Sequence, residues 1–248
     1  MTRIGRSCLV GNFALAGLWL SGATSARGDS ISALNPSSYW AFDAATSGPA
    51  TASQITDSSG NGHDANSVTA ANGAALTWSD LGNGNAGLAF SPYLVAAGNP
   101  DQVAPAAVNI GSYTITGNST FITRMYWDGY FSDDSTAKQT WFYRNGESGA
   151  TVNGSDVTYN GWLLGIADVG GTAQFRLYST GRSASSVPNE VTDFGSVTPG
   201  TWFSLALVFN AASNEMTYYI LPDGGNLTEA TVDRIVSLGT GSNTTTIG

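Results

Sequence analysis

Seven short runs of aromatic, β-branched and other apolar residues follow one another after residue 30, and they constrain the fold more than any other feature of the chain. Within each run, apolar residues either alternate with polar ones or continue without a break, which is typical of half-buried and buried β-strands. No segment in this region places apolar residues at helical spacing. We therefore predict strands at residues 38–43, 87–91, 119–127, 161–167, 174–178, 201–209 and 216–221.

Dipeptides that favour tight turns separate these runs. They are Asp128-Gly129, Asn145-Gly146, Asn153-Gly154, Asn160-Gly161 and Asp223-Gly224. Such pairs accept the positive φ angles of β-hairpins, so neighbouring strands are expected to run antiparallel. The strand number and the lack of crossover helices predict an all-β fold of two packed antiparallel sheets, a sandwich or jelly roll. Residues 92–108 and 179–189 are expected to form long surface loops.

The first 26 residues have the composition of a secretory signal peptide. Arg3 and Arg6 form a basic start, residues 8–20 are largely apolar, and small residues fill positions 21–26. We predict cleavage after Ala26, with Ala23 as the second choice, followed by a short lead-in at residues 27–37 and one domain at 38–248. The apolar part is short for a membrane span, so the mature chain is expected to be secreted, extracellular or at the cell surface, without membrane insertion.

The net charge limits the classes of partner that the chain can bind, and its cysteine content limits what can stabilise the fold. The formal net charge is −9, and removal of the signal peptide leaves seven basic against 18 acidic residues, or −11. Such a surface disfavours nucleic acid as a partner. Cys8 is the only cysteine and lies in the signal peptide, so the mature chain is expected to depend on core packing, or on a bound ion, rather than on disulfides.

The stretch ITDSSGNGHDA at residues 55–65 resembles the first half of a calcium-binding loop. Asp57, Ser59 and Asn61 place oxygen ligands at alternate positions, Gly62 allows a sharp turn, and His63 would contribute its main-chain carbonyl. Val68 stands where an EF-hand has its bidentate acid, so calcium binding would be weak, on the order of 10⁻⁴ to 10⁻³ M. The alternative is an Asx-type turn without an ion, in which the same side chains accept main-chain N–H groups. The pattern alone leaves both readings open, and it places the His63 side chain at the surface.

The same loop also matches the G-x-G-x-x-A pattern of dinucleotide-binding turns, at residues 60–65. That pattern needs a helix N-terminus directly after it, and the glycine and β-branched residues at 66–73 do not favour a helix. A nucleotide site is therefore not predicted.

Several segments together resemble the laminin G-like jelly rolls of the concanavalin A-like superfamily. These segments are Tyr39-Trp-Ala-Phe-Asp43, Thr56-Asp-Ser-Ser-Gly-Asn-Gly-His-Asp-Ala65, Gly87-Leu-Ala-Phe90, Thr198-Pro-Gly-Thr-Trp-Phe-Ser-Leu-Ala-Leu-Val-Phe-Asn210 and Met216-Thr-Tyr-Tyr-Ile-Leu-Pro-Asp-Gly224. The resemblance covers roughly residues 38–248. It implies a two-sheet jelly roll, extracellular use, and a structural calcium ion held partly by Asp57 and by carbonyls around Asn61 and His63.

In one respect the sequence departs from that family. Its members usually continue into a closing strand that can pair beside the first strand, whereas this sequence ends at Gly248. Either the sequence is incomplete, or residues 39–43 are expected to lie beside an unpaired sheet edge.

Catalysis is not expected from the residues available. Glycosidases of this superfamily carry an E-x-D-x-E strand, and none of the four glutamates here has an acidic residue two positions away. A single histidine, no G-x-S-x-G segment and no cysteine after the signal peptide also provide little for hydrolysis with a nucleophilic serine or a metal. We predict a non-catalytic protein, with an atypical carbohydrate-active enzyme as the alternative.

An aromatic-rich turn at residues 125–134 is the candidate ligand site. Trp127 and Tyr130, or Phe131, could stack against a sugar ring, and Asp133 and Asp134 could accept hydrogen bonds from its hydroxyls. In the alternative these aromatics close one end of the sandwich. The predicted partner is a glycan or an extracellular protein, and a structural surface domain without a small ligand is the other possibility. The core is predicted to contain Trp40, Phe90, Trp162, Trp202 and Phe209.

Overall fold

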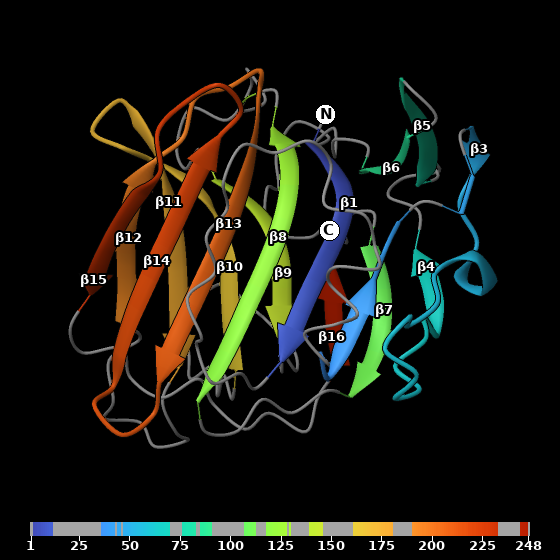
Figure 1. The fold of residues 1–248 in the computed structure, drawn as a ribbon, viewed down its shortest axis with the longest axis horizontal. Helices are drawn as coiled ribbons and strands as arrows, with labels where there is room; N and C mark the ends of the chain where they lie inside the picture. The colour runs from blue at the N-terminus through green and yellow to red at the C-terminus, as the bar shows by residue number, and fades with distance from the viewer. Residues whose placement is uncertain are drawn as a thin grey trace, which may run out of the picture.

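The computed structural model shows an all-β protein in which two antiparallel sheets pack face to face (Figure 1). It describes residues 2–11, 36–42, 44–45, 47–69, 76–82, 85–90, 107–112, 118–127, 129, 139–145, 161–180, 190–232 and 244–247. No α-helix occurs within these ranges, and η1 (Ala52–Gln54) is a single 3₁₀ turn. Accordingly, the described residues contain no helix with the length and apolar character that crossing a membrane requires.

Sheet A contains nine strands among the described residues, and β2 (Ser38–Trp40) pairs with β1 beside the main path. The order along that path is β15 (Thr228–Val232), β14 (Glu215–Pro222), β13 (Thr201–Asn210), β8 (Ser119–Trp127), β1 (Thr2–Gly11), β6 (Asn85–Phe90), β5 (Thr77–Gly82) and β3 (Gly48–Pro49).

Sheet B contains seven strands within the described ranges and lies behind sheet A in Figure 1. Its order is β12 (Glu190–Ser196), β11 (Thr172–Thr180), β10 (Gly161–Val169), β9 (Gln139–Asn145), β16 (Thr244–Ile247), β7 (Ala107–Ser112) and β4 (Ser67–Thr69).

Alternation along β13, and along β8 from Phe121 onward, creates the core between the sheets. In β13, the side chains of Phe203, Leu205, Leu207 and Phe209 are buried, while the residues between them are half-buried. Residues two apart on a strand share a face, so this pattern points every second side chain toward sheet B. Contacts across the layers include Phe203 on Phe175, with ring centroids 5.2 Å apart, and Phe121 on Tyr143, at 5.0 Å.

All seven strands predicted from the sequence are present, with ends that differ by a few residues. Four of the five predicted core residues, Trp40, Phe90, Trp162 and Phe209, belong to the core. The prediction for Trp202 is wrong. Because Phe203 faces inward on β13, the preceding residue must point out of the sandwich, and Trp202 is half-buried on the outer face of sheet A.

Strand β1 lies in the predicted signal peptide and is a central strand of sheet A. It pairs antiparallel with β8 along one side and with β6 and β2 along the other. Ser38–Trp40 pairs with Val10–Cys8 of β1 on one side, so β1 takes the place beside the first strand, and on the other side of β2 an isolated bridge joins Trp40 to Asp57. Cleavage after Ala26 stays a prediction, since residues 12–35 lie outside the described ranges.

A bulge interrupts β12, the last strand of sheet B. Phe194 is opposite Phe175 and Ser196 is opposite Gln174, so Gly195 between them has no partner of its own in β11. Gly195 has a φ of +52°, and a Cβ atom at this position would overlap Cδ1 of Ile220 on β14. Glycine is therefore favoured here by the backbone conformation, and any larger residue would also require the end of the Ile220 side chain to move.

Candidate functional site

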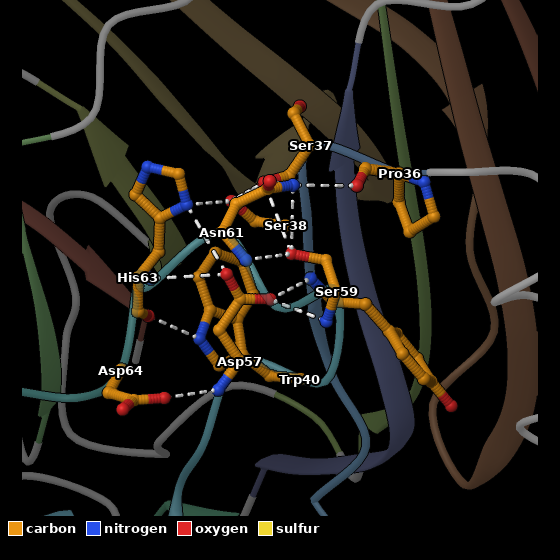
Figure 2. A network of polar contacts seen from close by, with 10 residues as sticks. Pro36, Ser37, Ser38, Trp40, Asp57, Ser59, Asn61, His63 and Asp64 are labelled. Atoms are coloured by element: carbon orange, nitrogen blue, oxygen red, sulfur yellow. Dashed lines mark hydrogen bonds and ion pairs between the residues drawn. The ribbon is translucent and has the colours of Figure 1, made fainter.

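Asp57 is the centre of the glycine-containing loop and accepts hydrogen bonds from three main-chain N–H groups. Its Oδ1 accepts from Tyr39 and Ser59, both at 2.9 Å, and its Oδ2 accepts from His63 at 3.1 Å (Figure 2). The side chain of Asp57 is fully buried. We call this arrangement, Asp57 with the N–H groups of Tyr39, Ser59 and His63, the Asp57 clamp. The bond from Tyr39 fastens the loop to β2, because Tyr39 belongs to that strand and precedes Asp57 by eighteen residues.

His63 adds two further connections between the loop and β2. Its Nδ1 lies 2.9 Å from Ser38 Oγ and 3.3 Å from Asp57 Oδ2. The Ser38 hydroxyl also donates to the carbonyl of Ser37 at 2.8 Å, so its oxygen can accept from His63 in the tautomer that carries the ring proton on Nδ1. The main-chain carbonyl of His63 accepts from the indole Nε1 of the buried Trp40, at 2.9 Å.

The remaining loop side chains satisfy other main-chain groups. Asn61 Nδ2 donates to the carbonyl of Ser37 at 3.1 Å, and Ser59 Oγ accepts from the Asn61 N–H at 3.3 Å. Gly60 and Gly62 have φ angles of +81° and +80°, a region that other residues rarely adopt. The sequence S-G-N-G thus lets the chain wrap around a single carboxylate.

The hydrogen bonds around Asp57 outweigh the effect of its burial. Burial raises the pKa of this carboxyl, but donors from the Ser59 side chain and from the main chain of Tyr39, Ser59 and His63 lower it by more. The net pKa therefore lies below the usual range for aspartate, and Asp57 is ionised in the folded protein at neutral pH.

The structure places the predicted calcium ligands Asp57, Ser59, Asn61 and His63 together in one loop. A carboxylate offers about four acceptor positions, and the three N–H donors and the His63 ring nitrogen occupy those of Asp57. Within the described ranges, no group of three or more His, Cys, Asp or Glu side chains is placed to hold a metal ion. This geometry matches the Asx-type turn, the alternative to the ion, and calcium at this loop stays a prediction.

The residues predicted to bind a ligand are only partly within the described ranges. Tyr130, Asp133 and Asp134 lie outside them, as does Phe131. Trp127 is fully buried in the core, opposite Thr201 of β13. Its ring cannot stack on a sugar from this position, because Trp127 follows the inward-facing residues Phe121, Thr123 and Met125 along β8.

A group of polar and aromatic side chains lies on the outer face of sheet A, beside the end of β8. Tyr126 and Trp202 are cross-strand neighbours with ring centroids 5.7 Å apart and an angle of 53° between the rings. The guanidinium of Arg124 lies 5.4 Å from the centre of the Trp202 ring, and it binds the carboxylate of Asp223 through two hydrogen bonds of 2.9 and 2.6 Å. We call these four residues the Trp202 cluster.

The Trp202 cluster is accessible to solvent. The Arg124 and Asp223 side chains are 31% and 49% exposed, and Tyr126 and Trp202 are half-buried. It therefore offers ring edges and faces, a guanidinium and a carboxylate at one place. Sequence reasoning missed this cluster, although the alternation along β8 and β13 contained the signal. Once Trp127 and Phe203 are assigned to the core, Tyr126 and Trp202 must point outward.

Comparisons with protein-family models, with curated proteins and with solved structures give no match to this chain. The structure by itself therefore defines the class of protein, an all-β protein with two packed antiparallel sheets.

Proposed function

We propose that the chain is a secreted, non-catalytic binding module of the laminin G-like jelly-roll type that recognises a glycan through the Trp202 cluster. The Trp202 cluster is the observation that carries this proposal. It combines two neighbouring aromatic rings with an exposed, bidentate Arg124–Asp223 pair. The loop predicted to bind the ligand starts directly after β8, so Tyr130 follows Tyr126 by four positions in the chain.

The chemistry of the cluster suits a pyranose ring. The apolar C–H face of a sugar packs against aromatic side chains, while its hydroxyls need paired donors and acceptors at the rim of the site. Arg124 supplies N–H donors and Asp223 supplies carboxylate acceptors, which adjacent hydroxyls can engage at the same time. A protein partner with exposed aromatic side chains is the second class of ligand that such a surface accommodates.

The described carboxylates support a non-catalytic role because several of them already have structural partners. Asp57 accepts three main-chain N–H groups, Asp193 pairs with Arg176, and Asp168 accepts the N–H of Gly171 in a turn. A glycosidase needs two carboxyl groups that face one sugar from opposite sides. Turnover of a polysaccharide that is lost on replacing one carboxylate would contradict this part of the proposal.

A glycan array tests the proposal directly. We expect the wild-type protein to bind a subset of glycans, and we expect Trp202→Ala to lose at least tenfold in affinity because the ring is a principal contact. Arg176→Ala is the matched control, since Arg176 forms a similar bidentate pair with Asp193 on the other sheet. Equal binding by the wild type and Trp202→Ala would exclude the cluster, and no binding at all would favour a structural surface domain.

Calcium at the Asp57 loop is tested separately, by thermal unfolding in millimolar calcium and in chelator. If the ion binds, the melting temperature of the wild type rises in calcium and Asp57→Ala removes the gain. Equal melting temperatures in the two conditions would count against the ion and favour the Asx-type turn, in which main-chain N–H groups are the partners of Asp57.

A further inference from the structure

Strand β1 fills a position in sheet A that is bounded by other strands on both sides. Eight of its residues pair with β8, from Thr2 opposite Trp127 to Gly11 opposite Thr120. On its other side, Thr2–Gly5 pairs with Phe90–Gly87 of β6, and Cys8–Val10 pairs with Trp40–Ser38 of β2. We call this position, between β8 and the β6 and β2 segments, the strand slot.

Alternate positions of the strand slot lie over the core. Residues directly opposite one another on antiparallel strands share a face of the sheet. On β8, the partners of Thr2, Ile4, Cys8 and Val10 are the buried residues Trp127, Met125, Thr123 and Phe121. On the far side, the partners of the same four positions are Phe90, Leu88, Trp40 and Ser38, which are also buried. A strand in the slot therefore covers core residues of three neighbouring strands.

The segment that fills the slot is also the segment that we predict to be removed on secretion. Its removal would leave the main-chain N–H and C=O groups of β8, β6 and β2 without partners along the slot, and it would uncover core side chains such as Met125 and Leu88. Unpaired strand edges beside apolar surface are a strong template for an incoming strand.

We propose that the strand slot is an acceptor site, and that the processed protein takes up an extended segment of another protein there by β-strand addition. The register defines the ligand. It is about ten residues long, runs antiparallel to β8, and carries apolar side chains at the positions opposite Met125 and Phe121. It lacks proline within the paired positions, because a strand with neighbours on both sides needs its N–H groups.

Two observations favour a different protein over a second copy of this chain. Every described strand after residue 36 is already paired within its own sheet, so a copy that donates one of them opens its own sheet to close another. In addition, the processed chain carries a formal charge of −11, which favours a neutral or basic ligand. This inference rests on the secretion and leader removal of the proposed function, but its site is separate from the Trp202 cluster, so glycan binding and strand uptake can each fail without the other.

Cleavage of the folded full-length chain tests the acceptor site. A specific protease sequence is inserted directly after Ala26, the protein is folded intact, and the chain is then cut. The probe is a fluorescent peptide with the sequence of residues 2–11, TRIGRSCLVG. We expect the peptide to exchange with the cut leader, and we expect the peptide carrying Ile4→Asp to bind at least tenfold more weakly, because position 4 lies between Met125 and Leu88.

Disulfide trapping fixes the register of the bound peptide. Cys8 is the only cysteine of the chain and is opposite Thr123, so a cut protein carrying Thr123→Cys should form a mixed disulfide with the peptide. Ile122→Cys is the matched control, because its side chain points to the opposite face of β8 and should not react. Equal trapping at both positions, or no peptide binding by the cut protein, would overturn the proposal. Dimers formed on cutting would overturn the choice of partner in favour of a second copy.

Discussion

The β8–β13 pair and the Asp57 clamp hold neighbouring parts of the same sheet by different means. Between β8 and β13, nine residue pairs are in register and every second side chain enters the core. At the Asp57 clamp, one buried carboxylate gathers three N–H groups of a loop and a short strand. Apolar burial distributes stability over many residues, whereas the clamp concentrates it in one. Mutations can therefore separate the two kinds of support.

The largest loss of stability is expected from truncation in the β13 core. Phe203→Ala removes a buried ring that packs on Phe175, and large-to-small changes of this kind cost about 3–5 kcal/mol. Val208→Thr, on the outer face of the same strand, should cost less than about 1 kcal/mol. Urea unfolding of both variants measures the difference, and similar losses would show that the alternation does not define the buried face.

A slightly smaller loss is expected at the Asp57 clamp. Asp57→Ala leaves three N–H groups of the loop without their acceptor, which should cost about 2–4 kcal/mol. Asp168→Ala is the control, since Asp168 accepts the N–H of Gly171 in an exposed turn and its loss should cost about 1 kcal/mol or less. If the two variants unfold at the same urea concentration, the clamp is not a concentrated source of stability.

The clamp should also make the free energy of unfolding depend on pH in the acidic range. The pKa of Asp57 is lower in the folded protein than in the unfolded chain, where it is about 3.9. Its contribution is thus complete above that value and is lost as the pH falls through the lower, folded pKa. Melting temperatures measured from pH 6 down to pH 2 should show a steeper decline for the wild type than for Asp57→Asn. Parallel curves would mean that another group controls the acid response.

The smallest effect on stability is expected at the Trp202 cluster. Arg124→Ala removes a partly exposed ion pair with Asp223 and the contact with the Trp202 ring, for a total of about 0.5–1.5 kcal/mol. Part of this loss should disappear in 1 M salt, which screens the ion pair. A loss as large as that of Phe203→Ala would indicate that the outer face is a second core and not a surface available to a ligand.

The same contrast explains what could be predicted from the sequence. Strands such as β8 and β13 were predictable because their alternation is encoded locally, residue by residue. Trp202 was assigned to the core on residue type alone, although the alternation of buried and half-buried residues along β13 points its side chain away from the core. Strands such as β5, β7, β9 and β12 were not predicted, because polar or charged residues flank or interrupt their short apolar stretches.

The clamp could be located from the sequence, but its chemistry could not be decided. D-S-S-G-N-G indicates a tight loop with oxygen-bearing side chains, and both an ion and main-chain N–H groups satisfy such oxygens. The choice depends on the approach of Tyr39 and Ser38, eighteen or more residues away, which no local pattern encodes. The pairing of β1 was equally out of reach, since a basic start and an apolar run describe a signal peptide and a strand alike.

The bulge at Gly195 has a consequence for solubility. Strand β12 ends sheet B, and a straight final strand would offer its free side to any other molecule at high concentration. The extra residue breaks the regular spacing of the N–H and C=O groups of β12. A side chain at position 195 would strain this bulge, because residues other than glycine rarely adopt its positive φ, and a straightened edge strand would favour fibrillar self-assembly more than simple unfolding.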